Sequence, residues 1–319
     1  MGRRCEDLRR KGRLMAAPEK RYGVQVTSNV PYGTARVNVS TSPKDRTLAL
    51  DVFSPEGASQ SPRPALIMAF GGAFHRGNKE TDEFDNDGHR NTPVSGYCRE
   101  FARRGYVAFS IDYRLVQEDP DPGTTPVIRE KANIPMSRVD VVRKILGLPP
   151  ATVEMLWAGI EAACDDMVTA FRFVEANALQ YGVDPKRIAV GGFSAGARTA
   201  LNAAYGEKLP AAAVISLSGF MASEDLERHV TGAAGQPPAF LVSGENDLDY
   251  IALQAGPMAR HFSNVGLQHE AWQVPGATHF YPGGSQIVDE GGRRSTLEEA
   301  MAEFVSATVG HPLVHFTHE

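Results

Sequence analysis

The sequence lacks the features that mark several common protein classes. Its 319 residues contain only three cysteines, at scattered positions without a C-x-x-C pair, so neither a disulfide framework nor a zinc site is expected. The 33 basic and 38 acidic residues give a net charge of -5, which provides no basic surface for nucleic acid. No apolar run approaches the roughly 20 residues of a membrane-spanning helix. We therefore expect a soluble protein with reduced thiols that binds a small, weakly charged substrate.

The N-terminal region also lacks a recognisable signal. Residues 1–20 show no periodicity and are predicted to form a flexible arm before a single domain at 21–319. The basic start is followed by polar and charged residues instead of the apolar core of a secretory signal. A cytoplasmic location is expected, Met15 is an alternative start to Met1, and a homodimer is left open.

Alternating strands and helices fill the rest of the chain. Two early segments alternate apolar and polar residues, as half-buried antiparallel strands do, whereas later strands are continuously apolar, as expected when both faces are covered. This alternation predicts an α/β fold, with a mostly parallel central sheet and helices on both faces. The predicted strands are 22–30, 47–53, 65–70, 106–111, 188–191, 212–217, 239–242 and 270–274, and the predicted helices are roughly 94–104, 152–180, 195–205, 250–265 and 296–308.

An insertion between Leu115 and about Glu161 (about 115–161) interrupts the alternation. It opens with an acidic Pro/Gly-rich loop and then places apolar residues at helical spacing over 136–146. Connections in α/β domains usually take two to six residues, and much longer ones are usually functional or disordered. We expect a small cap over the active site, with an extra helix packed on the body and a membrane-surface lipase lid as alternatives.

The pentapeptide Gly192-Phe193-Ser194-Ala195-Gly196 lies between a strand-like run and a small-residue helical segment. A sharp turn between strand and helix can lift a serine hydroxyl out of the sheet. The glycines fit this role, because larger side chains two positions from the serine would collide with the neighbouring strand and helix. Ser194 is therefore the predicted nucleophile.

A serine nucleophile needs a base that accepts its proton and an acid that orients the base. After such a turn the partners follow in the order acid, then histidine. His279 is the predicted base because it lies on a loop after the last predicted strand. Asp247 is the predicted acid because it follows the strand at 239–243, and Asp249 and Glu245 are the alternatives. Asp249 could instead cap the next helix.

The reaction also needs hydrogen-bond donors for the oxyanion that forms on the substrate. Backbone amides at tight turns supply them without reorganisation. Ala195 opens the helix after the nucleophile, and Gly72 and Ala73 belong to a small-residue turn directly after a buried strand. These three residues are the predicted oxyanion hole, although the turn could also be an ordinary strand-to-helix connection.

Five stretches together resemble α/β-hydrolases of the carboxylesterase and lipase group. The resemblance covers roughly residues 22–310 and implies the α/β-hydrolase fold, with Ser194, Asp247 and His279 as catalytic residues and Gly72, Ala73 and Ala195 around the oxyanion. The stretches are Phe70-Gly71-Gly72-Ala73-Phe74, Asp112-Tyr113-Arg114-Leu115, Gly192 to Gly196, Gly244-Glu245-Asn246-Asp247 and Gly276-Ala277-Thr278-His279.

Two departures narrow the resemblance. The hormone-sensitive-lipase-like branch carries a His-Gly-Gly-Gly motif, and here Phe70 and Ala73 replace its first and last members. That branch usually has an acidic residue before the nucleophile, where this chain has Phe193. The chain is therefore more similar to carboxylesterases of the acetyl- or feruloyl-esterase type.

The predicted function is that of a serine carboxylesterase acting on small esters with short- to medium-chain or aromatic acyl groups. Phe74, Phe220, Met221 and Phe280 are predicted to line the substrate pocket, with Tyr281 beside them, although such apolar residues are as often plain core. No cofactor or metal is expected. The alternatives are a carbohydrate acetyl or feruloyl esterase, a formamidase-like amide hydrolase, a peptidase, and a non-catalytic ligand-binding protein with a hydrolase fold.

Overall fold

A computed structural model describes residues 22–86 and 88–311, and the predicted arm at 1–20 lies outside the described residues. A ten-stranded sheet forms the centre of the described chain, with the strand order β1-β2-β6-β3-β7-β8-β9-β10-β11-β12. Neighbours from β6 to β10 pair in parallel, and the strands at both edges pair antiparallel. The strands are β1 (Val24–Val37), β2 (Lys44–Pro55), β3 (Arg63–Ala69), β6 (Val107–Ile111), β7 (Val183–Phe193), β8 (Ala213–Leu217), β9 (Ala239–Gly244), β10 (His269–Val274), β11 (Gln286–Asp289) and β12 (Arg294–Thr296).

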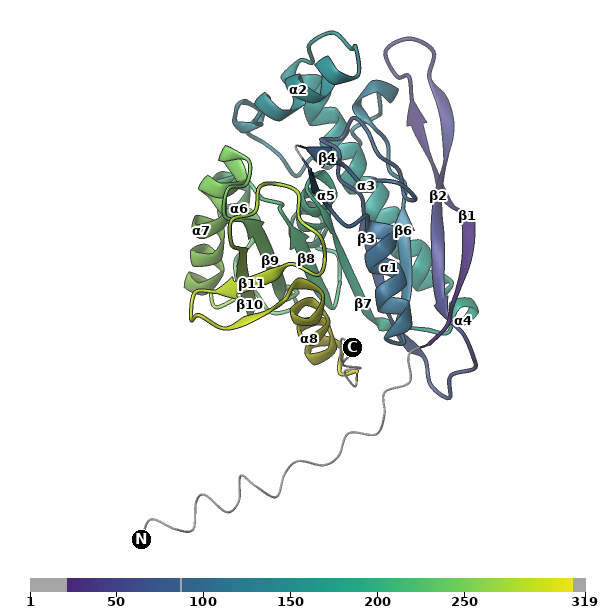
Figure 1. The fold of residues 1–319 in the computed structure, drawn as a ribbon. Helices are drawn as coiled ribbons and strands as arrows, with labels where there is room; N and C mark the ends of the chain where they lie inside the picture. The colour runs from purple at the N-terminus through teal and green to yellow at the C-terminus, as the bar shows by residue number, and fades with distance from the viewer. Residues whose placement is uncertain (1–21, 87, 312–319) are drawn as a thin grey trace, which may run out of the picture.

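Helices cover both faces of this sheet. In Figure 1, α1 and α8 lie in front of the sheet and α3 lies behind it. A buried ion pair joins the two front helices, because Arg104 at the end of α1 lies 2.6 Å from the carboxylate of Glu299 in α8. The helices are α1 (Val94–Arg103), α2 (Ser137–Ile145), α3 (Val153–Ala176), α4 (Ala178–Tyr181), α5 (Ala195–Leu201), α6 (Ser223–His229), α7 (Asp249–Asn264) and α8 (Leu297–Val309).

The continuously apolar runs form the central strands, as predicted. Every residue of β3, β6 and β8 is buried, and burial of apolar surface on this scale is the main stabilising contribution to a fold of this kind. The mostly parallel sheet with helices on both faces confirms the predicted fold class. Cys98 and Cys164 are buried free thiols.

Several short elements were not predicted. They are α6, the edge strands β11 and β12, and a two-stranded ribbon of β4 (Asp85–Asn86) and β5 (His89–Arg90). The helix predicted from the apolar spacing at 136–146 is α2. The next helix, α3, already begins at Val153, inside the predicted insertion, where the Thr152 hydroxyl accepts a hydrogen bond from the Met155 amide.

No helix in residues 22–86 and 88–311 has both the length and the apolar character needed to cross a bilayer.

Candidate active site

Ser194 lies at the sharp turn between β7 and α5. Its backbone has φ 54° and ψ −113°, a strained conformation for a residue with a side chain. The flanking glycines make the turn possible: a Cβ atom on Gly192 would lie 2.4 Å from the Gly196 carbonyl carbon, and one on Gly196 would lie 2.0 Å from the Ala69 oxygen. The steric reason expected for the two glycines is therefore present.

The structure brings Ser194, His279 and Asp247 together in a single chain of hydrogen bonds. The Ser194 Oγ lies 2.8 Å from His279 Nε2, and His279 Nδ1 lies 2.6 Å from Asp247 Oδ1. Both distances are those of good hydrogen bonds. The proposed alternatives for the acid have other places: Asp249 is the first residue of α7, and the Glu245 carboxylate accepts a hydrogen bond from the Gly276 amide.

Asp247 is held as an ionised acceptor. Its Oδ2 accepts hydrogen bonds from the Ser218 hydroxyl at 2.5 Å and from the Gly244 amide at 3.0 Å. Burial acts to raise the pKa of Asp247. This effect is outweighed by the hydrogen bond from His279, by the charge of His279, and by the hydrogen bonds from Ser218 and Gly244. The pKa of Asp247 is therefore lowered below its ordinary value. The carboxylate can thus orient the imidazole and stabilise its positive form.

Ser218 is a site residue that the sequence analysis missed. It follows β8, and its hydroxyl bridges Asp247 and the buried Tyr281 hydroxyl, which lies 2.7 Å away. Tyr281 therefore supports the acid, whereas the sequence analysis expected it beside the substrate. A serine after a buried strand was the available signal, but only the fold shows that its hydroxyl reaches Asp247.

The turn after β3 has an unusual backbone. Gly72, Ala73 and Phe74 have φ values of 115°, 55° and 61°, a run of strained residues that surrounding contacts must hold in place. Tyr113 holds the start of this turn through two contacts with Phe70. The Tyr113 ring stacks on the Phe70 ring, and the Tyr113 hydroxyl donates a hydrogen bond to the Phe70 carbonyl at 2.8 Å.

Ala73 and Ala195 line the same cavity as Ser194. In the described part of the chain, neither the Ala73 nor the Ala195 amide donates to a protein acceptor. The Ala195 amide also opens α5, where the positive end of the helix dipole favours negative charge. Two free amides beside the serine are what an oxyanion would require. Gly72 belongs to the same turn, and among the described residues its amide has no protein acceptor either.

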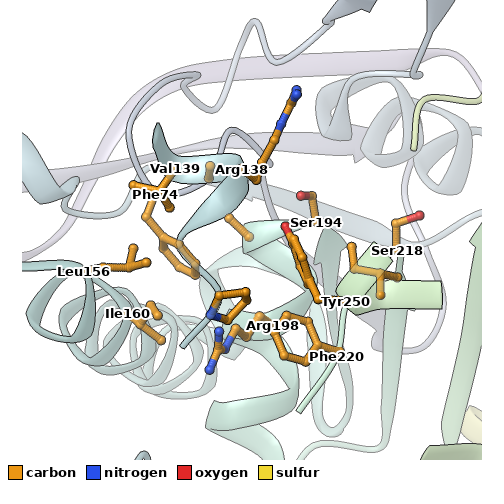
Figure 2. Close-up of a pocket in the computed structure, with 14 residues that line it drawn as sticks. Phe74, Arg138, Val139, Leu156, Ile160, Ser194, Arg198, Ser218, Phe220 and Tyr250 are labelled. Atoms are coloured by element: carbon orange, nitrogen blue, oxygen red, sulfur yellow. The ribbon is translucent and has the colours of Figure 1, made fainter. Parts of the chain in front are cut away.

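The cavity next to Ser194 is small, with a volume of about 40 Å³. A single water needs roughly 10–15 Å³ on this measure, so the cavity accepts only a short chain. Figure 2 shows the side chains from the oxyanion turn, α2, α3, α5 and α7 around it. Its wall consists of Ala73, Phe74, Pro135, Arg138, Val139, Leu156, Ile160, Ser194, Ala195, Arg198, Ser218, Phe220, Tyr250 and Ile251.

A second, larger cavity of about 330 Å³ lies on the His279 side. Arg138 and Tyr250 line both spaces. The larger cavity is lined by Ser137, Arg138, Val141, Asn246, Asp247, Leu248, Asp249, Tyr250, Thr278, His279 and Phe280. The site therefore has a narrow side and a wide side.

The predicted pocket residues have three different places. Phe74 and Phe220 line the small cavity, and Phe280 lines the larger one beside the His279 ring. Met221 lines neither, because it is buried in the core. The sequence analysis missed the polar lining residues Arg198 and Tyr250, whose spacing gave no sign of a site.

In the described ranges, no three or more His, Cys, Asp or Glu side chains form a group that could hold a metal ion.

One comparison with known protein families matches the part of the chain that contains this site. The family model of phospholipases and carboxylesterases matches residues 158–284, a segment that contains Ser194, Asp247 and His279. No curated protein matches the sequence.

Several solved structures similar to this chain are esterases. Thermogutta terrifontis esterase 2 phosphorylated by paraoxon is 19% identical with a TM-score of 0.56, over 89% of this chain and 94% of that one. The same esterase from this Planctomycetes species with bound propionate is 19% identical with a TM-score of 0.51, over 81% and 85%. A truncated carbohydrate esterase from gut microbiota is 15% identical with a TM-score of 0.55, over 92% and 98%.

At these identities the solved structures show the fold, and the family match supports an esterase. The chain therefore has the α/β-hydrolase fold, and its residues 158–284 match the family model of phospholipases and carboxylesterases.

Proposed function

We propose that the protein is a serine carboxylesterase that hydrolyses small carboxylic esters through an acyl-enzyme intermediate. The observation that carries this proposal is the chain of hydrogen bonds from Ser194 through His279 to Asp247, beside a cavity. A nucleophile, a base and an orienting acid within hydrogen-bond reach are the recognised requirements of this chemistry.

In the first half-reaction, the Ser194 oxygen attacks the ester carbonyl carbon while its proton passes to His279 Nε2. The negative charge that develops on the carbonyl oxygen is stabilised by the amides of Ala73 and Ala195. The tetrahedral intermediate then expels the alkoxide, which takes the proton from His279 and leaves as an alcohol. Ser194 now carries the acyl group as an ester.

In the second half-reaction, water replaces the alcohol. His279 takes a proton from the water as its oxygen attacks the acyl carbon. Collapse of this second intermediate returns the proton to Ser194 and releases the carboxylic acid. Atoms balance as one ester and one water giving one alcohol and one acid.

The two cavities support one placement of the two parts of the ester. The leaving alcohol must lie next to His279, which protonates it, so it belongs in the larger cavity. The acyl group then occupies the small cavity, whose volume of about 40 Å³ favours short chains. This preference is narrower than the short- to medium-chain or aromatic range that the sequence suggested.

A fluorophosphonate probe, which reacts with activated serines, tests the mechanism. We expect one equivalent of label on the folded protein and none on Ser194→Ala. Ester hydrolysis should fall by about 10³-fold or more in this variant. If the folded wild type resists the probe and hydrolyses no ester, the proposal is wrong.

A panel of esters and amides tests the proposed substrate class. p-Nitrophenyl esters from acetyl to octanoyl should show kcat/KM highest at two to four carbons, if the cavity next to Ser194 holds the acyl chain. Sugar acetates and an acyl anilide belong in the same panel. A higher kcat/KM on either of these would favour the carbohydrate esterase or the amide hydrolase instead.

A further inference from the structure

Arg198 lies one helical turn after Ser194 in α5 and faces the same cavity. Its amide donates to the Ser194 carbonyl at 3.0 Å, which fixes its place relative to the nucleophile. The residue is only 5% exposed and lines the small cavity. Figure 2 shows its guanidinium beside this cavity, whereas the guanidinium of Arg138 extends away from the other labelled side chains.

The Arg198 guanidinium lacks the partner that a buried cation normally has. Within residues 22–86 and 88–311, no ion pair or hydrogen bond includes this group, and its Nε is buried without an acceptor. It makes a cation–π contact with the Phe220 ring, 4.7 Å from the guanidinium carbon to the ring centre. A cation–π contact compensates part of the lost hydration but accepts no hydrogen bond in the plane of the guanidinium.

The acidic groups that face Arg198 are engaged elsewhere. Both oxygens of Glu161 accept hydrogen bonds from the amides of Val127 and Ile128. The carboxylate of Asp225 lies 3.8 Å from the guanidinium of Arg228. The negative charges of Asp225 and Glu161 act on Arg198, but neither carboxylate lies within ion-pair distance of it. Burial lowers the pKa of Arg198 to about 10 despite these charges and the Tyr250 hydroxyl, so the group stays a cation at neutral pH.

A buried cation with free N–H donors requires an acceptor, and the cavity is the space in which one can lie. The acyl group of the substrate occupies that space under the proposed function. We propose that Arg198 binds a carboxylate at the far end of the acyl group, so that the preferred substrates are half-esters of short dicarboxylic acids. This inference rests on the proposed esterase function and specifies its substrate class.

Two properties favour a carboxylate over a neutral oxygen. A guanidinium presents paired donors that match the two oxygens of a carboxylate. A charged acceptor also neutralises a desolvated cation, which a ketone or hydroxyl cannot do. The aliphatic side chains of Val139, Leu156 and Ile160 enclose the methylene groups between the two ends of such an acyl chain.

The test compares isosteric methyl esters by the rate of acid release. Methyl butanoate and methyl 4-oxopentanoate are the neutral esters, and monomethyl malonate, succinate and glutarate are the half-esters. In the wild type, the best half-ester should exceed methyl butanoate in kcat/KM by about tenfold or more. Succinate should also inhibit the hydrolysis of methyl butanoate at lower concentration than butanoate does.

Substitutions test whether Arg198 causes the preference for half-esters over neutral esters. Arg198→Met should reduce the half-ester to neutral-ester ratio by about tenfold or more, and Arg198→Lys should retain part of it. Arg172→Met, which removes an exposed arginine from α3, should leave the ratio unchanged. The ratio is a readout that a general loss of structure does not move.

Several outcomes would overturn the inference. An unchanged ratio in Arg198→Met would remove Arg198 from recognition, and equal rates for methyl 4-oxopentanoate and the half-esters would exclude the carboxylate. If Arg198→Met does not fold, wild-type enzyme without half-ester preference or succinate inhibition overturns the inference by itself. Hydrolysis of neutral esters without any half-ester preference leaves the esterase proposal intact, whereas an unreactive Ser194 overturns both.

Discussion

At the residue scale, Ser218 connects the acid of the site to a buried tyrosine. Replacing Ser218 by Ala removes a hydrogen bond to the Asp247 carboxylate and leaves the Tyr281 hydroxyl without its partner. We expect kcat to fall by about tenfold, since a hydrogen bond to a charged group contributes about 1.5–3 kcal/mol. Steady-state kinetics on a p-nitrophenyl ester measures this.

Tyr281→Phe is the matched control, because it removes only the outer partner of Ser218 and leaves the hydrogen bond to Asp247 in place. Its kcat should stay within a few-fold of the wild type. A larger loss in Tyr281→Phe than in Ser218→Ala would contradict the positioning role assigned to Ser218.

The pH dependence of activity should show a simple acid limb. The reaction needs a neutral imidazole at His279, so kcat/KM should fall as this group takes up a proton. The pKa of Asp247 lies below its ordinary value of 3.8, so its carboxylate stays ionised, and its contribution to stability is lost only as the pH falls below that range. We expect the acid limb to have the slope of one proton, because Asp247 stays ionised. A two-proton slope would contradict the assignment.

At the element scale, the sequence predicted the buried central strands and missed several short elements outside them. The apolar runs of β3, β6 and β8 are recognisable because both faces of each strand are covered. The helix α6 has only seven residues, and β12 has three with none buried. Periodicity needs more residues than these to rise above chance.

The site was predictable where its residues follow strands. Ser194, Asp247 and His279 each lie on a turn or loop beyond a strand end, and the structure brings them into contact, while their catalytic roles stay a prediction. Arg198 was not predictable, because an arginine on a helix normally lies in solvent and only the packing of α5 against the sheet and α3 buries it.

The turn between β7 and α5 should tolerate no side chain at Gly196. A Cβ there would lie 2.0 Å from the Ala69 carbonyl oxygen, which forces β3 and α5 apart. We expect Gly196→Ala to lower the free energy of unfolding by about 3 kcal/mol or more, measured by urea denaturation.

Gly284→Ala is the control for this prediction, because no atom lies within 4 Å of a Cβ built at that exposed position. Its free energy of unfolding should change by no more than about 0.5 kcal/mol. Equal stability of the two variants would show that the turn relaxes more easily than its contacts indicate.

At the scale of the whole molecule, Asp82 links the oxyanion turn to the front helix layer. Its Oδ1 accepts a hydrogen bond from the Val94 amide at the start of α1, and its Oδ2 accepts one from the Gly71 amide. The side chain is fully buried. Any change in its ionisation therefore acts on a sheet-to-helix contact and on the turn beside Ser194 together.

This position should make stability depend on pH. Burial raises the pKa of Asp82 from 3.8 to about 7, against the two amide hydrogen bonds. A carboxyl whose pKa is raised in the folded state stabilises that state when the pH is below its ordinary pKa. This contribution to stability is lost as the pH rises to about 7. Wild-type protein should therefore lose up to about 3 kcal/mol from this group between pH 5 and 8.

Asp82→Asn cannot ionise, so its free energy of unfolding should fall less than that of the wild type across the same interval, as measured by urea denaturation at pH 5, 6, 7 and 8. Other titrating groups, including His75 and His311, whose pKa values burial lowers, are common to both proteins and cancel in the difference. Asp140→Asn removes an exposed carboxylate from α2 and should give a curve parallel to the wild type. A parallel curve for Asp82→Asn would mean that the Val94 and Gly71 amides keep Asp82 ionised across the whole range, and that its link between α1 and the oxyanion turn is insensitive to pH.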